Sequence, residues 1–245
     1  MPDFIVPDWP APPRVRALQT TRHGGVSCGG YASLNLGDHV GDAAEAVREN
    51  RARVCASLPA EPLWLRQVHG CAVAEAGRDR PGVEADAALA RLPGQVCVVM
   101  TADCLPVLLC DRSGSVVAAA HAGWRGLCAG VIERTIAAMG VAGPELLAWL
   151  GPAIGPAAFE VGEEVRSAFV AVDAAAGAAF VARGGGKWNA DLYLLARQRL
   201  AACGVGAVYG GEACTFAEAE RFFSYRRDGE TGRMGTLIWL EKGGV

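Results

Sequence analysis

Two short apolar runs joined by a polar turn constrain the fold of this chain more than any other feature. Residues 105–110 and 116–120 are rich in Leu, Val and Ala, and the polar turn Asp111–Gly114 lies between them. Runs of this length, bounded by turn residues, predict two buried strands joined as a hairpin. In an antiparallel pair, the start of the first strand lies beside the end of the second. Cys104 and His121 are therefore expected at the same edge of a sheet. There a thiol and an imidazole could bind a metal or act as nucleophile and base.

The rest of the chain alternates helical and extended patterns. Apolar residues at helical spacing predict helices at 43–58, 127–139, 163–172 and 190–203. Runs of β-forming residues predict further strands at 15–18, 63–65, 96–100, 146–150, 205–209 and 236–240. We expect Asp42 to cap the first helix and Asn189 to cap the last. The Ala/Gly-rich segment 173–186 is expected to be a variable surface segment.

The organisation of these elements predicts a single domain. No internal repeat and no clear linker interrupts the chain, so we expect one domain over residues 1–245 that begins with an extended lead-in at 1–13.

Charge and hydropathy disfavour several classes of partner. The net charge is −3 and the chain has no basic run, so nucleic acid is not expected as a partner. No apolar run is long enough to span a bilayer, and the N-terminus is acidic and interrupted by prolines, unlike a signal peptide. We therefore expect a cytoplasmic protein with no membrane partner.

The cysteines are predicted to be reduced thiols. There are nine, scattered along the chain and without a Cys-x-x-Cys pair. Cys97, Cys110 and Cys128 lie among apolar or small residues, which favours packing in the core. Cys104 differs from them, because it lies at the predicted sheet edge that also carries His121.

A third metal-binding side chain is predicted near that edge. His69 follows the run of β-formers that begins at residue 63, and the chain has only four histidines. Together His69, Cys104 and His121 would form a three-ligand set with an open fourth position, which is typical of catalytic zinc. Their long separations in the sequence do not establish a site. A packed cysteine beside two hydrogen-bonded histidines would give the same pattern.

Two glycine-containing turns carry arginines. TTRHGG contains Arg22, and SYRRDG contains Arg226 and Arg227. Backbone amides at such turns can face an anion, and a guanidinium beside them adds charge. An ordinary loop is the alternative explanation for each turn.

Several longer motifs occur in a fixed order between residues 20 and 240. They are TTRHGGVS, NLGDHVGD, QVHG, TADCLPVLL, HAGWRG, GPAIGP with FEVG, and CT followed by FFSYRRDGETGRMG. The chain resembles the YfiH family, also called the multicopper polyphenol oxidase (laccase-like) or peptidoglycan editing factor family. That family includes the animal protein laccase domain-containing 1. TADCLPVLL together with HAGWRG is the most specific part of the resemblance.

The resemblance implies an α+β zinc protein, with mixed β-sheets flanked by helices, whose ligands are His69, Cys104 and His121. It also implies phosphorolysis of adenosine, inosine and methylthioadenosine, and deamination of adenosine to inosine. Copper-dependent phenol oxidation and editing of a peptidoglycan precursor are the other roles ascribed to the family. Many relatives have CCYEVG after GPAIGP, whereas this chain has Ala157-Ala158-Phe159. It therefore lacks a thiol there that copper chemistry could use.

Both purine reactions are chemically reasonable at one site. Deamination requires an activated water at C6 of the purine, and zinc can lower the pKa of a water molecule. Phosphorolysis requires bound phosphate, which guanidinium groups bind bidentately. The candidate phosphate-binding residues are Arg22, Arg125, Arg226 and Arg227. Asp103 or Glu160 could transfer a proton to the purine, although either could instead be a structural hydrogen-bond acceptor. Trp124 could stack on a base or simply pack in the core.

Three other functions remain open from the sequence. A cysteine hydrolase would use Cys104 as nucleophile and His121 as base. A copper oxidase would use the same ligands as zinc, but three protein ligands hold one metal and not a multicopper cluster. A non-catalytic scaffold would use the metal only to brace a binding surface. The predicted ligands and partners are therefore Zn²⁺, with copper less favoured, together with purine nucleosides and phosphate.

Overall fold

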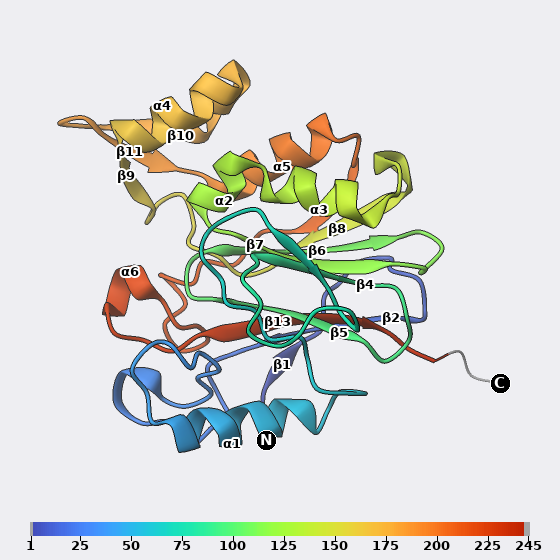
Figure 1. Cartoon of the computed structure of the whole chain (residues 1–245). Helices are drawn as coiled ribbons and strands as arrows, with labels where there is room; N and C mark the ends of the chain where they lie inside the picture. The colour runs from blue at the N-terminus through green and yellow to red at the C-terminus, as the bar shows by residue number, and fades with distance from the viewer. Residues whose placement is uncertain (1, 243–245) are drawn as a thin grey trace.

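The computed structural model describes residues 2–242 and contains two stacked β-sheets with helices on both outer sides (Figure 1). The four-stranded sheet contains, in order, β1 (Phe4–Ile5), β2 (Val15–Thr20), β13 (Met234–Leu240) and β5 (Val96–Thr101). The six-stranded sheet contains, in order, β12 (Ala207–Gly210), β8 (Leu146–Leu150), β6 (Leu105–Asp111), β7 (Val117–Ala122), β4 (Ala87–Ala90) and β3 (Val73–Glu75). The pairs β12–β8 and β3–β4 are parallel and the other neighbours are antiparallel.

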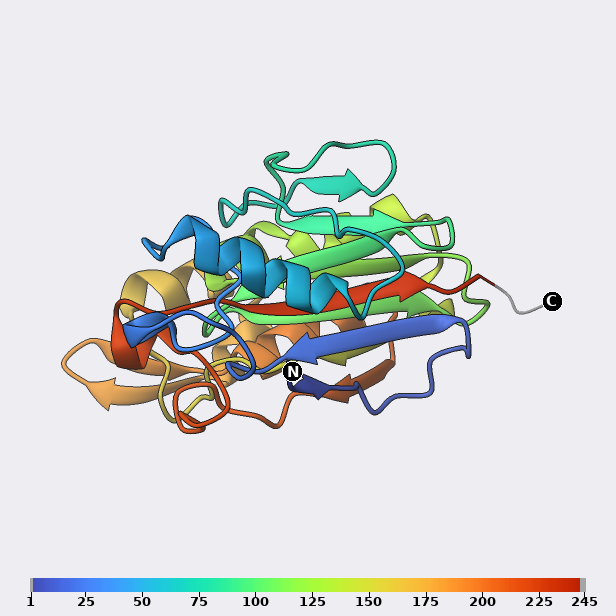
Figure 2. The same ribbon diagram turned by 90° about the horizontal axis from the view of Figure 1, so that it is seen from below.

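Helices cover the outer face of each sheet. The α-helices are α1 (Ala44–Cys55), α2 (Trp124–Ala129), α3 (Val131–Met139), α4 (Glu163–Val172), α5 (Leu192–Ala202) and α6 (Tyr225–Asp228). The 3₁₀ helices are η1 (Gly29–Tyr31), η2 (Gly143–Glu145) and η3 (Ala174–Ala179). Helices α2, α3 and α5 lie over the six-stranded sheet, whereas α1 lies across the outer side of the four-stranded sheet (Figures 1 and 2). This mixed arrangement confirms the predicted α+β class.

A third, smaller sheet projects from this body. It contains β10 (Phe180–Gly184), β11 (Lys187–Ala190) and β9 (Glu160–Gly162), all antiparallel. Together with α4 it forms the arm at the upper left of Figure 1. The prediction of a variable surface segment at 173–186 missed this order, because η3 and β10 occupy most of that segment. The side chains of Ala176, Ala179 and Phe180 are buried against α4 and α5, so its small residues serve packing.

Alternation along β6 divides the core into two layers. Leu105, Val107 and Leu109 face the helices, whereas Leu108 and Cys110 face the four-stranded sheet. Successive side chains of a strand point to opposite faces, so a strand buried on both sides is apolar throughout. All seven residues of β6 are buried. The predicted hairpin is confirmed, and its register places Pro106 opposite His121.

Three local predictions were wrong. The helix predicted at 127–139 is two helices separated by Gly130, whose φ of 95° is left-handed and interrupts helical hydrogen bonding. Residues 63–65 form no strand and make only an isolated bridge, Leu63 to Cys97. The cap residues also differ from those predicted.

The predicted capping residues have other roles. Asp42 is not the N-cap of α1, because its carboxylate accepts hydrogen bonds from Ser27 and Asn35. Asn189 lies within β11, and Asp191 caps α5 by accepting from the Leu194 amide. Tertiary contacts thus engage Asp42 away from the helix, and the neighbouring Asp191 caps α5 in place of Asn189.

Candidate functional site

The hairpin brings Cys104 and His121 together at one edge of the six-stranded sheet. Cys104 immediately precedes β6. His121 is the last residue but one of β7 and lies opposite Pro106. His121 is 3% exposed, whereas Cys104 is half-buried. The thiol is therefore reachable from the surface while the imidazole is fixed in the core.

His69 completes the cluster from a loop held in a left-handed conformation. Its φ is 61°, and the φ of Asp103, next to Cys104, is 86°. They are the non-glycine residues with positive φ among residues 2–242. Such a conformation costs on the order of 1–3 kcal/mol and persists where surrounding contacts hold it, often at functional sites. Both therefore mark the same small region as strained.

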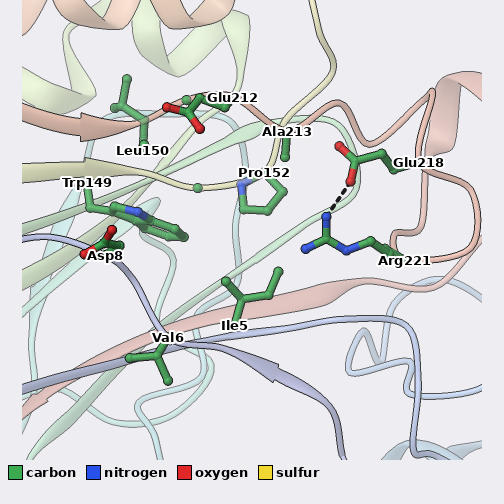
Figure 3. Close-up of a pocket in the computed structure, with 13 residues that line it drawn as sticks. Ile5, Val6, Asp8, Trp149, Leu150, Pro152, Glu212, Ala213, Glu218 and Arg221 are labelled. Carbon is green, nitrogen blue, oxygen red and sulfur yellow. Dashed lines mark hydrogen bonds and ion pairs between the residues drawn. The ribbon is translucent and has the colours of Figure 1, made fainter.

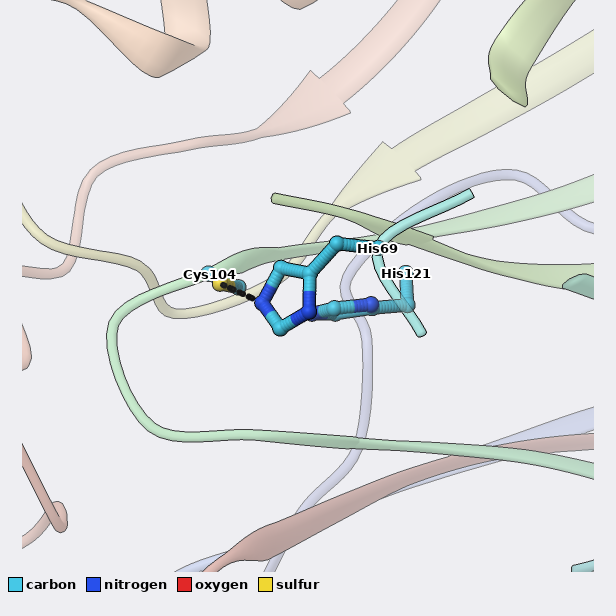
Figure 4. A group of neighbouring side chains, drawn as sticks. All are labelled: His69, Cys104 and His121. Atoms are coloured by element: carbon cyan, nitrogen blue, oxygen red, sulfur yellow. Dashed lines mark hydrogen bonds between the residues drawn. The ribbon is translucent and has the colours of Figure 1, made fainter. Parts of the chain in front are cut away.

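The three side chains converge on one point. The distance from Cys104 Sγ to His69 Nε2 is 3.8 Å, and one potential ligand atom from each of His69, Cys104 and His121 lies within 4.8 Å of the other two (Figure 4). The two imidazole rings meet edge to face, with centroids 4.8 Å apart. In a tetrahedral zinc site, neighbouring sulfur and nitrogen ligands lie about 3.3–3.6 Å apart. These three residues, called here the His–Cys–His cluster, therefore need only small shifts to hold one metal ion.

Gly123 leaves the space that the cluster requires. A Cβ at this position would lie 2.9 Å from Cys104 Sγ, 2.9 Å from His69 Cδ2 and 3.5 Å from His121 Cε1. The φ of Gly123 is −60°, so steric space and not backbone conformation calls for glycine here. The requirement for glycine at the third position of the HAGWRG motif is thus explained by the close approach of Cys104 and His69.

Asp86, immediately before β4, positions two members of the cluster, and its role was not predicted from the sequence. Its carboxylate is fully buried and accepts the backbone N–H groups of Val68, His69 and Gly70 at 2.7–3.1 Å. The same carboxylate lies 2.8 Å from His121 Nδ1. A carboxylate on the far nitrogen of a histidine fixes the ring so that its other nitrogen faces a metal.

Pairing of strands explains how Asp86 reaches His121. Asp86 immediately precedes β4, and β4 pairs with β7 so that Ala87 lies opposite Ala120. The backbone agrees, because His121 N–H donates to the Asp86 carbonyl at 2.7 Å. An aspartate at the start of an apolar run was the available sequence signal. Only the pairing of β4 with β7 shows which histidine it contacts.

The protonation of the cluster is shifted by its own members. Burial alone would raise the pKa of Cys104, but His121 and His69 lower it to about 6. Burial alone would lower the pKa of His121, but Cys104 and Asp86 raise it to about 9. Burial likewise opposes ionisation of Asp86, yet His121 and the Gly70 amide hold its pKa below the usual value. The thiol is thus already biased toward the thiolate, the form that binds metal.

The two acids proposed as proton donors differ sharply. Asp103 is buried, and its carboxylate accepts from Thr215 Oγ1 and from the Arg226 backbone N–H, both at 2.6 Å. Both of its oxygens are therefore engaged in joining the loop before β6 to α6. Glu160 is exposed on β9, and its carbonyl accepts from Arg226 Nη1 at 2.9 Å.

Two of the four predicted arginines each donate to two or more backbone carbonyls. Arg22 donates to the carbonyls of Ala32 and Ala219. Arg227 donates to the carbonyls of Thr215, Phe216 and Phe222 and pairs with Asp228. These contacts hold loops together and fit a structural role.

The other two arginines are more available. Arg226 is exposed and lies over Phe159, while one of its nitrogens donates to Glu160. Arg125 is exposed at the start of α2, with its guanidinium 4.5 Å from the centre of the Trp124 ring. Trp124 is partly buried against the helix-covered core layer, so packing accounts for much of its surface.

A separate cavity lies along the same edge of the six-stranded sheet. Its volume is about 400 Å³, and its lining includes Leu150, Gly151 and Gly210 at the ends of β8 and β12. An ion pair between Glu218 and Arg221 lies at one side (Figure 3). None of the residues of the His–Cys–His cluster lines this cavity. The cavity and the cluster are therefore different features of that edge.

The helices that the structure describes do not include one with the length and apolar character needed to cross a bilayer.

Taken together, the fold and the cluster define an α+β protein with a three-ligand site suited to one metal ion. Residues 16–241 match the family described as multi-copper polyphenol oxidoreductase laccase, and the chain belongs to this family. The resemblance inferred from the motifs is thereby confirmed.

Curated relatives and solved structures agree over nearly the whole chain. A purine nucleoside phosphorylase of Pseudomonas aeruginosa is 59% identical over 97% of this chain and 98% of its own length. The purine nucleoside phosphorylase YfiH of Escherichia coli is 58% identical, over 98% of this chain and 100% of its own length. A crystal structure of a Neisseria meningitidis protein is 55% identical and superposes with a TM-score of 0.95, covering 98% of this chain and 99% of that one. YlmD of Geobacillus stearothermophilus is 31% identical, with a TM-score of 0.86, over 94% of this chain and 93% of that one.

Proposed function

We propose that this chain is a zinc-dependent purine nucleoside phosphorylase. It would convert adenosine, inosine and methylthioadenosine to the free base and (methylthio)ribose 1-phosphate, and would also deaminate adenosine to inosine. The convergence of His69, Cys104 and His121 on one point carries the proposal. Relatives named purine nucleoside phosphorylase at 58–59% identity support the substrate class.

The donor set favours zinc over other metals. One thiolate and two imidazoles suit zinc, and three protein ligands leave a fourth position for substrate. Hard cations such as Mg²⁺ prefer oxygen ligands, and three ligands do not make a multicopper cluster. Zinc in this position would act as a Lewis acid on the bound substrate. Copper remains the less favoured alternative.

The protein's own groups would position and protonate the substrate. Asp86 holds the His121 ring and the His69 loop, so it acts as a positioning residue. Since both oxygens of Asp103 are engaged, we assign it a positioning role too. Glu160 has the exposed carboxylate of the two acids, and we propose it as the proton donor to the leaving purine.

Product analysis tests the proposed reaction. Zinc-loaded protein incubated with inosine should release hypoxanthine only when phosphate is present, with ribose 1-phosphate in equal amount. Cys104→Ser should lower the rate by roughly 100-fold or more, because a direct ligand is worth at least as much as the groups that orient it. Cys28→Ser is the matched control, since Cys28 is exposed and, among residues 2–242, its thiol hydrogen-bonds to the Val26 carbonyl alone. Base release that does not depend on phosphate would contradict the proposal.

One observation favours a second candidate function, a cysteine hydrolase. Cys104, His121 and Asp86 have the order of a nucleophile, a base and a residue that orients the base. Such an enzyme could act on a peptidoglycan precursor. The presence of His69 as a further ligand favours the metal site instead. Iodoacetamide separates the two: in zinc-loaded protein Cys104 should resist alkylation, and labelling in parallel with loss of activity would favour the hydrolase.

A further inference from the structure

Arg233 immediately precedes Met234, which pairs with Thr101 three residues before Cys104, and it was not among the predicted site residues. Its charge interacts with those of Cys104 and Asp103. Its backbone is fixed on both sides, because its N–H donates to Asn35 Oδ1 and its carbonyl accepts from the Leu36 amide. Gly37 provides room for its stem: a Cβ there would lie 2.8 Å from Arg233 Cγ. The guanidinium is therefore held in place by packing.

This guanidinium has no carboxylate partner within residues 2–242. Nη1 donates to the carbonyls of Thr231 and Gly232 at 2.8 and 3.0 Å, and no hydrogen bond from the remaining N–H donors is found in the described structure. Among other half-buried arginines, Arg51 pairs with Asp38 at 3.2 Å, whereas Arg22 and Arg197 donate to backbone carbonyls. Removing a charge from water is costly unless an opposite charge compensates it. Burial accordingly lowers the pKa of Arg233. The charges of Cys104 and Asp103 oppose this effect without outweighing it, so the guanidinium can still accommodate a bound anion.

Two buried hydroxyl groups point to the same region. Four buried side-chain atoms of the described chain lack a hydrogen-bond partner, and two of them are Thr101 Oγ1 and Thr231 Oγ1. Each of these threonines is 1% exposed. Buried polar groups are normally satisfied, so each of these unsatisfied hydroxyls calls for an explanation such as a ligand.

Strand pairing places both threonines near Cys104. Thr101 ends β5 and lies opposite Met234, the first residue of β13. Because the pair is antiparallel, the segment that precedes Met234 and the segment that follows Thr101 leave the sheet at the same edge. Thr231 belongs to the first segment and Cys104 to the second.

We propose that Arg233, with the hydroxyls of Thr231 and Thr101, forms the anion-binding part of the site and binds inorganic phosphate beside the His–Cys–His cluster. This rests on the proposed function and identifies residues for the co-substrate. Guanidinium and hydroxyl donors are the groups that suit phosphate oxygens. Within the described residues, Arg227 uses all three side-chain nitrogens in hydrogen bonds and Arg22 uses two, whereas Arg233 uses Nη1 alone.

Phosphate bound in this position would be the nucleophile of the proposed phosphorolysis. An oxygen of the bound phosphate forms a bond to C1′ of the ribose. The C1′–N9 bond breaks, its electron pair goes to the purine, and the purine receives a proton from an acid of the site. The products are the free purine and ribose 1-phosphate. Arg233 stays charged throughout and holds the phosphate in place for attack.

Direct phosphate binding tests the proposal without relying on activity. In equilibrium dialysis of zinc-loaded protein with labelled phosphate, Arg233→Gln should raise the dissociation constant roughly 30- to 150-fold, the scale of a lost charged hydrogen-bonding partner. Arg233→Lys, which keeps the charge, should recover part of this loss. In kinetics the KM for phosphate should rise while the KM for inosine changes less than about 3-fold. Arg51→Gln is the matched control, because it removes a half-buried guanidinium that already has a carboxylate partner.

A second variant guards against simple misfolding. Thr231→Val replaces an unsatisfied buried hydroxyl with a methyl group of similar shape. It should leave the midpoint of thermal unfolding unchanged or higher, yet weaken phosphate binding by roughly 5- to 10-fold. Damage to the fold cannot produce these two changes together.

The outcomes separate the anion site from the proposed function. Wild-type protein that releases base in a phosphate-dependent way, while Arg233→Gln and Thr231→Val bind phosphate normally, would overturn the anion site alone. Phosphate binding that depends on Arg233 in a protein without phosphorolysis would support the anion site and overturn the proposed function.

Discussion

The two ends of the β6–β7 hairpin are each organised by a buried aspartate, and they differ in what the aspartate holds. At the turn end, Asp111 accepts from the backbone amides of Ser115 and Val116 and from two serine hydroxyls. At the other end, Asp86 accepts from three backbone amides and from His121. In both, burial opposes ionisation but the hydrogen bonds hold the pKa below its usual value. One end is a stable turn, and the other carries the His–Cys–His cluster.

Sequence distance separates the two aspartates. The partners of Asp111 lie within five residues of it, so its contacts are a property of the turn itself. The partners of Asp86 lie 16–18 and 35 residues away. The first network stabilises one turn, whereas the second fixes two potential ligands relative to each other and depends on the completed sheet.

Each end also has a glycine, again for different reasons. Gly114 has a φ of 67°, so its backbone conformation favours glycine at the turn, and a Cβ there would also lie 2.9 Å from Cγ of Arg14. Gly123 has ordinary backbone angles, and its lack of a side chain makes room for the cluster. Equivalent substitutions at the two ends should therefore have different consequences.

The largest expected effect is that of Gly123→Ala. The new methyl group would overlap both Cys104 Sγ and His69 Cδ2, so the three ligands could not close on one metal. We expect near-complete loss of bound zinc, measured by elemental analysis after dialysis. Gly114→Ala is the control: its left-handed backbone should cost roughly 1–2 kcal/mol of stability. Its new methyl group meets the flexible stem of Arg14 and not the cluster, so the zinc should stay in place. Full zinc content in Gly123→Ala would show that the cluster does not need the space that Gly123 leaves.

A smaller effect is expected for Asp86→Asn. The amide keeps the size of the side chain but loses the charge and one acceptor, so the His121 ring and the His69 loop are less firmly held. Loss of such an orienting carboxylate typically lowers metal affinity by roughly 10- to 100-fold. Competition with a chromophoric chelator measures the affinity. Asp111→Asn, at the other end of the hairpin, should not change it, and equal losses in both variants would show that Asp86 acts only on the fold.

The smallest effect concerns stability at the turn. Asp111→Asn should lower the free energy of unfolding at pH 7 by about 1–3 kcal/mol, because hydrogen bonds to a buried charge are lost. The folded-state pKa of Asp111 is lowered, so its contribution is present above the unfolded pKa of about 4 and disappears as pH falls through the folded value. Urea titrations from pH 7 to pH 2 should thus show the wild-type and variant curves converging below about pH 4. A difference that persists at pH 2 would mean that the charge of Asp111 is not the cause.

Features encoded within a few residues were predictable from the sequence. The hairpin was found because two apolar runs flank a polar turn, and its antiparallel geometry then placed Cys104 beside His121. His69 was found because histidines are few and this one follows a run of β-formers. The motif order identified the family over almost the whole chain.

Features that depend on contacts between distant segments were not predictable. Asp86 reaches His121 only through the pairing of β4 with β7. Arg233 comes beside the cluster only because β13 pairs with β5. The backbone partners of Arg22 come from Ala32 and from a loop nearly 200 residues away, so its engagement could not be seen in the sequence.

Zinc content of the wild-type protein and of Cys104→Ser tests the metal site most directly. Protein purified without chelators should contain about one zinc per chain, since three ligands of this kind hold a single ion. Cys104→Ser should retain less than about a tenth of that amount and keep its fold by circular dichroism. Full occupancy in the variant, or no zinc in the wild-type protein after reconstitution with excess metal, would contradict a metal site built from His69, Cys104 and His121.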